Sequence, residues 1–541
     1  MWLEGRTEHL SCPNCGLTTE TLQLLDIEFR PPEKILNYTR HVCAHCSASF
    51  VDNMQSINYS LGKVLETGWD AYQVQLGAGV WPIAALLMRP TKPAGAKVLE
   101  IGGAYGFGLD FCNRARGWQG LGYDPSPIAD FGAHELGLAL SRDYFEEKDL
   151  GKGPWDIALA TELIEHLERP LEFLALMRQA LTEDGILVLT TPAAEALSPA
   201  IDKTALLPLL SPGAHLVLQS AKSLEIVLHL AGFTHVVVVR EAMSLVGYAS
   251  RAPFCLSDDK PAARAAYRRY LVERGRLAAP ESNARFGFAG RGIFEAANDG
   301  DGAAVADAWA VLVPAARTRF GLDLETMTEL PAGATASSLF ELERIMPLGL
   351  GMILFARAMH LLRTGATRAT VLPLLRLAGA ACGALQGALA ARSQADGLTA
   401  SLVPAIETEI LLCQAEAGDA ACVAGLLNRD DITAGWRGFV ALVNAGAFEL
   451  AAELKQSLLP EMPGQELDEA LRRDALFTLG VLRLQNPQGW ALGAALFAQL
   501  RAELMQGAAP GTKLPALFWP ALRAETLALR LLDREEEAED L

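Results

Sequence analysis

Four cysteines near the N-terminus stand in two pairs with the spacing of metal ligands. The pairs are Cys12-Pro-Asn-Cys15 and Cys43-Ala-His-Cys46. A Cys-x-x-Cys turn places two thiolates on one side of a tight knuckle, and two knuckles supply a tetrahedral site of four sulfurs. We therefore predict a zinc ion whose role is structural, because four protein ligands close its coordination. Three nearby histidines are rival ligands: His9, His41 and His45.

A turn rich in small residues follows a predicted strand at 97–101. The segment Val98-Leu-Glu-Ile-Gly-Gly-Ala-Tyr-Gly runs from apolar residues through an acid into the turn, and a helix is predicted after it. Glycines at such a turn let the backbone approach a ligand where a Cβ would collide. A dinucleotide site needs Gly-x-Gly-x-x-Gly, but Ala104 and Phe107 occupy two of the glycine positions. Glu100 would repel a pyrophosphate, whereas it suits a cofactor with a cationic ammonium and sulfonium, so the turn favours S-adenosylmethionine.

Further segments in chain order extend this pattern into a family resemblance. Glu100-x-Gly-x-Ala-x-Gly106 resembles the first motif of class I S-adenosylmethionine-dependent methyltransferases, with Ala104 in place of the usual middle glycine. Three later stretches are similar to the family in the same order: Gly122-Tyr-Asp-Pro-Ser, Trp155-Asp-Ile-Ala-Leu-Ala-Thr-Glu, and Asp184-Gly-Ile-Leu-Val-Leu-Thr-Thr-Pro with the following Gly213-Ala-His-Leu. The resemblance covers about residues 55–250 and implies a Rossmann-like sheet with helices on both faces.

The resemblance also implies which residues contact the cofactor. The methionine end would be lined by Glu100, Gly102, Ala104 and Gly106. Asp124 would accept hydrogen bonds from the ribose hydroxyls, with Tyr123 and Pro125 beside it, and Asp143 is a candidate for the adenine edge. Thr161 and Glu162 would lie near the sulfonium. Three aromatic residues on the lead-in segment would cap the site: Tyr59, Trp69 and Tyr72.

An oxygen acceptor must lose a proton during methyl transfer, and two histidines are candidates for the base. His166 follows the fourth predicted strand, and His215 follows the fifth. Ligands of open α/β sheets bind at the carboxyl ends of the strands, where both histidines are expected. His166 is our first choice and His215 the second. The alternative for each is a histidine with a structural role only.

The 541 residues divide into three stretches that must position these groups. Residues 1–55 are polar and cysteine-paired, which predicts a small zinc-binding module. Residues 56–255 alternate apolar runs with helical segments, which predicts an α/β domain with a mostly parallel sheet. Residues 256–541 are rich in Ala and Leu without strand patterns, which predicts an all-helical domain; two segments faintly resemble a tetratricopeptide helix pair. The predicted strands are 97–101, 120–123, 157–161, 185–190 and 234–240.

Composition limits the partners and the location of the chain. The formal net charge of −18 opposes binding to phosphate backbones, so nucleic acid is not expected as a partner. The mean hydropathy is +0.20, but Arg357 and Arg376 interrupt the longest apolar runs, so no membrane span is expected. The N-terminus lacks an apolar targeting segment, and five further cysteines are scattered, which indicates a reducing compartment and a cytoplasmic protein.

The order of the segments bears on the methyl acceptor. A zinc module ahead of this catalytic domain resembles bacterial methyltransferases that act on sugars, including deoxysugar C-methyltransferases and enzymes of surface-glycan assembly. We therefore expect O- or C-methylation of a sugar or glycan. One alternative is a protein or non-sugar metabolite recruited by the helical region, and another is a non-catalytic scaffold, at which Ala104 hints. The helical region would bind a protein partner or another copy of the chain.

Overall fold

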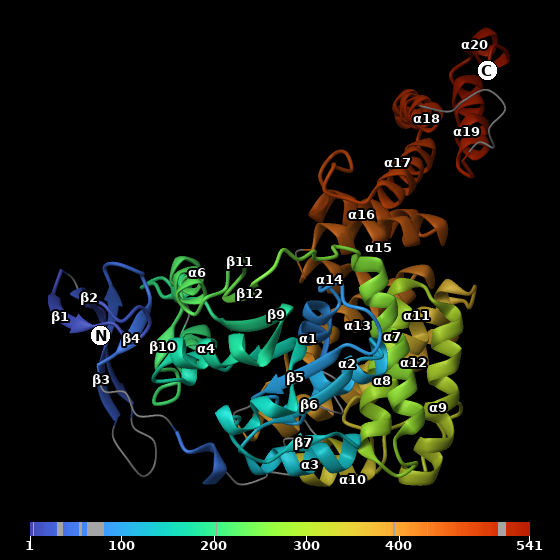
Figure 1. The fold of residues 1–541 in the computed structure, drawn as a ribbon. Helices are drawn as coiled ribbons and strands as arrows, with labels where there is room; N and C mark the ends of the chain where they lie inside the picture. The colour runs from blue at the N-terminus through green and yellow to red at the C-terminus, as the bar shows by residue number, and fades with distance from the viewer. Residues whose placement is uncertain are drawn as a thin grey trace. The chain divides into compact units, whose positions relative to one another are not determined.

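The structure of this protein is a computed structural model (Figure 1), which describes residues 1–3, 5–29, 36–52, 57–61, 80–201, 203–392, 395–429, 431–506 and 515–541. Trp69 and Tyr72, two of the aromatic residues proposed to cap the site, lie outside the described residues. The chain divides into two compact units, Met1–Ala278 and Ala279–Leu541. The first unit holds two β-sheets, and the second is helical in its described part.

The larger sheet of the first unit has seven strands in the order β11-β12-β9-β8-β5-β6-β7. Their bounds are β5 Lys97–Ile101, β6 Gln119–Tyr123, β7 Leu140–Ser141, β8 Trp155–Thr161, β9 Leu181–Pro192, β11 His235–Glu241 and β12 Ser244–Ser250. The strands from β7 to β9 are parallel, and β12 joins β9 antiparallel. The predicted mixed α/β, Rossmann-like sheet and its five predicted strands are confirmed, whereas β7 and β12 were not predicted.

Helices cover both faces of this sheet, so its central strands are buried on both sides. On one face, Leu99 and Ile101 of β5 pack with α4 (Pro170–Ala180) and α6 (Ala221–Leu230). On the other face lie α1 (Val80–Leu87) and α2 (Phe107–Ala115) (Figure 1). Alternate strand residues point to opposite faces, so Glu100 faces α2 while its neighbours Leu99 and Ile101 face α4 and α6. Two further helices are α3 Pro127–Leu136 and α5 Lys203–Leu210.

The N-terminal residues form a second sheet, in the order β1-β2-β3-β4-β10. The bounds are β1 Thr7–Ser11, β2 Thr18–Phe29, β3 Leu36–Cys43, β4 Ser49–Val51 and β10 Val217–Leu218. All neighbours in it are antiparallel, and Val217 of β10 pairs with Phe50 of β4. The predicted module of residues 1–55 therefore takes its last strand from the predicted α/β domain, at residues 217–218.

The first unit extends beyond the predicted domain boundary at residue 255. Its last helix is α7 (Lys260–Leu277), which packs against α1 and α2. Asp110 of α2 is buried; it accepts a hydrogen bond from the Tyr270 hydroxyl (2.7 Å) and pairs with the Arg274 guanidinium (3.1 Å). A buried carboxylate that lost these partners would be costly, so this network ties α7 to the first unit.

The second unit confirms the expectation of a helical region after the sheet. Its helices are α8 Asn283–Asp299, α9 Gly302–Phe320, α10 Leu339–Ile345, α11 Leu350–Arg363, α12 Arg368–Ala390, α13 Gly397–Glu416, α14 Ala421–Leu427, α15 Ile432–Asn444, α16 Phe448–Leu458, α17 Glu469–Leu484, α18 Trp490–Met505, α19 Phe518–Leu531 and α20 Glu535–Glu539. Successive helices pack on one another, as α11 with α12 and α17 with α18. Gly446 lies between α15 and α16 and has φ 76°. Residues of a right-handed helix need negative φ, so this glycine separates the two helices.

Two helices of the second unit are long and apolar enough to cross a membrane by length and composition. They are α12, with a mean hydropathy of 1.3, and α13, with 1.2. The bent pair of α10 and α11 meets the same test when it is counted as one span. Inside the unit, α12 packs against both α11 and α13, and about half of each apolar window is buried. Burial between neighbouring helices is one physical reason for such a composition.

Candidate active site and metal centre

The turn after β5 is built from residues with left-handed backbone conformations. Gly102 has φ 69°, Ala104 has φ 49° and Gly106, the residue before α2, has φ 80°. Glycine adopts such angles freely, whereas Ala104 pays about 1–2 kcal/mol for its Cβ. A Cβ on Gly106 would lie 2.8 Å from Leu138 Cδ1, so the turn is also crowded. Left-handed backbone angles together with side-chain crowding therefore favour small residues at positions 102, 104 and 106.

Glu100 lies beneath this turn, where the chain itself supplies its surroundings. The side chain is 2% exposed, and its Oε2 accepts the Leu109 backbone N–H at 3.1 Å. A Cβ on Gly103 would lie 2.5 Å from Glu100 Cδ, and one on Gly108 would lie 2.2 Å from Oε1. Two glycines thus make room for this acid, a reason that the sequence analysis missed. Burial is the main cause that raises the pKa of Glu100 to about 8; the Leu109 N–H opposes this rise and the carboxylate of Asp124 adds to it.

Asp124 follows β6 and holds the same turn from the neighbouring strand. Its Oδ2 accepts the Ala104 N–H at 2.8 Å, and its Oδ1 accepts the Ser126 N–H at 2.8 Å and the Ser126 hydroxyl. The residue is 7% exposed. Each carboxylate oxygen can accept more than one hydrogen bond, so these contacts leave capacity for a ligand hydroxyl. Asp124 therefore joins the ends of β5 and β6 at the predicted cofactor site.

The neighbours of Asp124 differ in where their side chains lie. Tyr123 is buried in the core on Phe145, and its hydroxyl donates to Asp149 Oδ1 at 3.1 Å. Its side chain is thus turned away from the turn, to which only its backbone carbonyl bonds, through the Gly102 N–H. Pro125 is partly buried beside Asp124, and Asp143 is exposed just after β7. Asp143 thus lies at the end of β7, the strand that neighbours β6 in the sheet.

Thr161 and Glu162 end β8 and line a cavity of about 970 Å³. The opposite wall is formed by α1 and the start of α7, with Trp81, Arg89 and Lys260 among the lining residues. The backbone N–H of Glu162 donates to the Thr190 carbonyl at 3.0 Å. Surrounding protein atoms raise the pKa of the Glu162 carboxyl by desolvation, although water reaches it from the cavity. A cavity therefore adjoins the two residues that were predicted to lie near the sulfonium.

The two histidines proposed as the base lie against each other. The His166 and His215 rings meet edge to face, with centroids 4.9 Å apart. His166 Nδ1 is 3.1 Å from the Ala214 carbonyl oxygen and 2.9 Å from the Tyr59 hydroxyl, and His215 Nδ1 is 2.8 Å from the Leu209 carbonyl oxygen. A carbonyl only accepts, so each Nδ1 carries the proton and each Nε2 keeps its lone pair. Neither histidine is among the described residues that line the cavity.

Both histidines are held in the neutral form by burial. Desolvation lowers the pKa of His166 below its usual value, and it lowers the pKa of His215 to about 4. A neutral imidazole with a free Nε2 is the form that can accept a proton. The structure thus brings together two groups that the chain separates by almost fifty residues, and both are chemically competent as bases.

Glu165 is a third member of this cluster that the sequence analysis did not assign. It is fully buried, its Oε2 accepts the Thr191 hydroxyl at 3.0 Å, and its Oε1 has no hydrogen-bond partner. Oε1 lies 3.7 Å from His166 Nε2. Burial raises the pKa of Glu165 to about 8. Its position beside His166 in the chain was the available signal, but only the fold shows that it faces the imidazole.

The four predicted metal ligands converge on one point in the N-terminal sheet. The distance from Cys12 Sγ to Cys46 Sγ is 3.7 Å, and from Cys15 Sγ to Cys43 Sγ it is 3.9 Å. Zinc–sulfur bonds of about 2.3 Å at tetrahedral angles require sulfurs about 3.8 Å apart. All four cysteines are buried and lie within one ligand group. The donor set therefore fits zinc without rearrangement.

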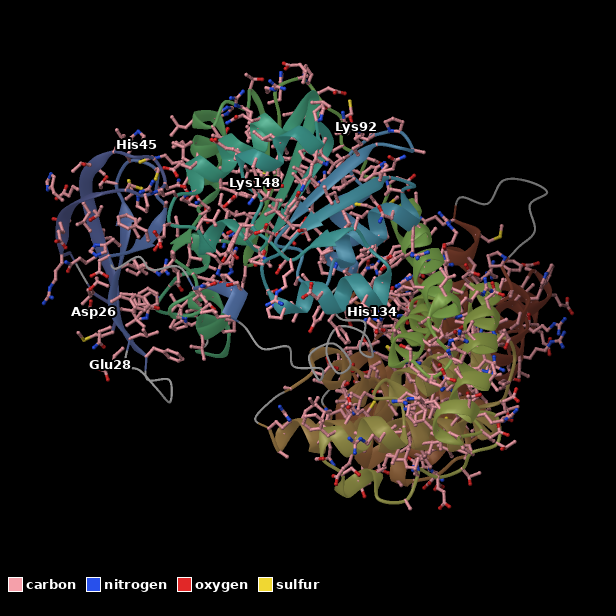
Figure 2. All side chains as sticks on the ribbon, turned by 60° about the horizontal axis from the view of Figure 1, so that its bottom comes forward. Asp26, Glu28, His45, Lys92, His134 and Lys148 are labelled. Atoms are coloured by element: carbon pink, nitrogen blue, oxygen red, sulfur yellow. The ribbon has the colours of Figure 1, made fainter. Side chains whose placement is uncertain are left out.

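The turns around the cysteines have the geometry of metal knuckles. Gly16 and Ser47, the residues after each pair, have φ 74° and 67°, and their N–H groups donate to the carbonyls of Cys12 and Cys43 at 2.9 Å. The rival histidines stay outside this group. His9 is exposed, His45 lies on the outer surface of the module in Figure 2, and His41 stacks on Phe50.

Comparisons with known proteins bear on residues 81–238, which match the family model described as a methyltransferase domain. No curated protein matches the chain. Among similar solved structures, a candidate O-methyltransferase from Nostoc punctiforme PCC 73102 is 17% identical over 32% of this chain and 56% of its own, with a TM-score of 0.26. An O-methyltransferase family protein from Burkholderia thailandensis is 15% identical over 34% of this chain and 58% of its own, with a TM-score of 0.27.

A third structure is an S-adenosylmethionine-dependent methyltransferase from Mesorhizobium loti, 17% identical over 32% of this chain and 99% of its own, with a TM-score of 0.26. The chain thus spans little more than half the length of the first two of these three proteins. The matched residues 81–238 hold the turn after β5, Asp124 and both histidines. The first unit therefore contains a Rossmann-like methyltransferase domain.

Proposed function

We propose that this chain transfers a methyl group from S-adenosylmethionine to a sugar or glycan acceptor, on oxygen or carbon. The observation that carries the proposal is the row of acids at neighbouring strand ends: Glu100, Asp124, Asp143 and Glu162. They lie around the turn after β5, and a cationic cofactor would gain from those acids of the row that are ionised. When bound, S-adenosylmethionine supplies an activated methyl group on a sulfonium with a good leaving group.

The residues of the chain would bind the cofactor, orient the acceptor and remove its proton. Asp124 would accept the ribose hydroxyls, and the turn of residues 102–106 would lie against the methionine end. For an oxygen acceptor, His166 would take the hydroxyl proton at Nε2. Glu165 Oε1 lies 3.7 Å from this atom, and the imidazolium that forms would favour the ionised form of Glu165, whose pKa burial raises to about 8. Holding both reactants in line is the larger part of such catalysis.

The cavity beside Glu162 supports a polar acceptor of moderate size, whose reacting hydroxyl would have to extend beyond the cavity lining to reach His166. Its volume of about 970 Å³ lies at the upper end of the range for small-molecule sites. It combines the Trp81 ring with charged groups, among them Arg89, Glu241 and Lys260. The Arg264 guanidinium lies 3.6 Å over the Trp81 ring, so the charged groups rather than that ring would meet the hydroxyls of a sugar, which need many hydrogen-bond partners. This lining suits a sugar better than an apolar metabolite.

Mass spectrometry after incubation with sugar nucleotides and cofactor tests the proposal. We expect a mass increase of one methyl group in one of the sugars. The Asp124→Ala variant should bind S-adenosylmethionine more weakly by roughly 1–3 kcal/mol in calorimetry, because charged-acceptor hydrogen bonds are lost. Glu147→Ala, at an exposed acid outside the predicted site, shows how much of the effect is long-range charge. Methylation of proteins and never of carbohydrate would contradict the acceptor, and unchanged affinity of Asp124→Ala would remove it from the site.

Binding of the cofactor should depend on pH through Glu100. The pKa of this acid is about 8 without a ligand, and a bound cation would lower it. The ionised form binds the cation better, so affinity should rise by up to about tenfold per pH unit as the pH approaches 8 and level off above it. Calorimetry in buffers of different ionisation enthalpy should detect the released proton. Glu100→Gln should lose this dependence, and a Gln variant with the same pH profile would show that another group titrates.

A further inference from the structure

We propose that Arg40 of the N-terminal sheet is a positioning residue for His215, and that the cysteine centre thereby supports the histidine pair without touching the cofactor. The inference rests on the proposed function for its kinetic consequence. Its physical basis is a set of contacts by which the metal module holds residues 215–223, next to the histidine pair. The contacts run from Arg40, from β4 and from the first cysteine knuckle.

Arg40 is a fully buried arginine that donates hydrogen bonds to backbone carbonyls. It lies on β3 and is 0% exposed. Its Nη2 donates to the His215 carbonyl oxygen at 2.6 Å, and its Nη1 donates to the Ser49 carbonyl oxygen at 3.1 Å. In the part of the chain that the structure describes, no carboxylate pairs with it. Burial lowers the pKa of the guanidinium to about 10, so it remains a cation at neutral pH.

A buried cation with only carbonyl partners is costly, which indicates that its contacts matter. One of these carbonyls belongs to His215 itself, and the other belongs to the strand that pairs with the segment after His215. A lysine could reach only part of this arrangement, because a guanidinium has five donors in a fixed plane. Arg40 thus ties β3, β4 and the His215 backbone together.

The backbone on both sides of His215 is held by the same elements. The Val51 N–H donates to the Leu216 carbonyl at 3.1 Å, and the Leu216 N–H donates to the Glu165 carbonyl at 2.7 Å. The preceding carbonyl, that of Ala214, is the one that accepts from His166 Nδ1. Residues 214–218 therefore lie between the metal module on one side and the Glu165 turn on the other. A shift of this segment would displace both imidazoles.

The first cysteine knuckle fixes the far end of this segment. Asn14, between Cys12 and Cys15, is fully buried; its Oδ1 accepts from Gln219 Nε2 at 2.8 Å and its Nδ2 donates to the Ser223 carbonyl at 3.2 Å. The second knuckle also contributes, since the Cys46 carbonyl accepts from the Ser220 hydroxyl at 3.4 Å. The start of α6 is thus bonded to both knuckles. Well-ordered knuckles should therefore keep residues 219–223 in place.

The cofactor turn lies outside this set of contacts. Among the described residues, no hydrogen bond joins the module to residues 102–106. The charge of Arg40 lowers the pKa of His215 and, within the N-terminal module, opposes the rise that burial causes in the pKa of Tyr38. Other titratable groups also lie close to His215. Glu165 and His166 each place a titratable atom within 4.8 Å of one on His215, and the Tyr59 hydroxyl lies 2.9 Å from His166 Nδ1. Loss of Arg40 should therefore alter proton transfer and leave cofactor affinity unchanged.

The test compares Arg40→Met and Arg40→Lys in the full chain with Arg6→Met, an exposed arginine of the same module. We expect Arg40→Met to lower kcat by 10- to 100-fold, to keep the Kd for S-adenosylmethionine within twofold, and to raise the pKa of His215 in NMR titration of histidine-labelled protein. Arg40→Lys should recover part of kcat, and Arg6→Met should match the unmodified chain. Equal weakening of cofactor binding, or an unchanged His215 titration in a folded Arg40→Met protein, would overturn the proposal.

Two further measurements keep the result decisive. If Arg40→Met does not fold, Asn14→Ala, which removes the first knuckle's contacts to Gln219 and Ser223, should lower kcat with the same unchanged Kd, provided that its metal content is unchanged. Full activity in a folded Asn14→Ala protein would then count against the proposal. The NMR titration does not depend on turnover, so it separates this inference from the proposed function. An unmodified chain that methylates no acceptor contradicts the proposed function, while a shifted His215 titration would still support the placement of Arg40.

Discussion

Replacing His166 by Asn is expected to lower kcat for methylation of an oxygen acceptor by about 10²- to 10⁴-fold, the usual contribution of a general base. The affinity for S-adenosylmethionine should change little, because the imidazole lies among Glu165, Ala214 and Tyr59 and not at the cofactor turn. Initial rates with labelled cofactor measure kcat, and calorimetry measures the affinity. His134→Asn is the matched control, since His134 is an exposed histidine of α3 in the same domain (Figure 2).

The pH profile of kcat distinguishes this base from other causes of the loss. Burial lowers the pKa of His166, so the neutral form persists below the ordinary value of about 6.5. Activity should therefore rise with pH along a limb whose midpoint lies below 6.5 and then level off. His215→Asn should keep this limb with a smaller loss of rate. The reverse, in which His215→Asn removes the limb and His166→Asn retains it, would exchange the two roles.

Loss of the metal is expected to have the largest effect on stability. The purified chain should contain one zinc ion, and Cys43→Ser or a strong chelator should lower the unfolding free energy of the first unit by several kcal/mol. Zinc supplies about 10–16 kcal/mol in isolated zinc-finger peptides, and part of this would be offset here by the surrounding core. That core includes the four cysteines together with Phe50, Leu216 and Val217. Elemental analysis and thermal unfolding measure the two quantities.

A matched cysteine variant separates metal binding from general thiol loss. Cys255 is exposed and lies outside the cysteine cluster, so Cys255→Ser should keep both the zinc content and the unfolding temperature. Four metal-protected thiols should also react slowly with a thiol reagent until chelator is added. A chain without bound metal that unfolds at the same temperature as the zinc-loaded chain would refute the structural role of the centre.

The sequence alone was sufficient for features that depend on local spacing. The two Cys-x-x-Cys pairs, the turn after β5 and the order of five strands are short patterns, and each was found where it was predicted. Their physics is local, because knuckles, left-handed turns and strand periodicity depend on residues a few positions apart. The methyltransferase domain could be predicted for the same reason, since its motifs follow one another in chain order.

Only the tertiary structure decided which distant groups meet. The pairing of β10 with β4, the place of α7 on the first unit, and the contact of Arg40 with His215 join residues far apart in the chain. No periodicity encodes such pairs, because they depend on how buried surfaces pack and on which polar groups must find partners there. Glu165 was visible as a neighbour of His166, but its burial with a free Oε1 arises only when the sheet and the helices close around it.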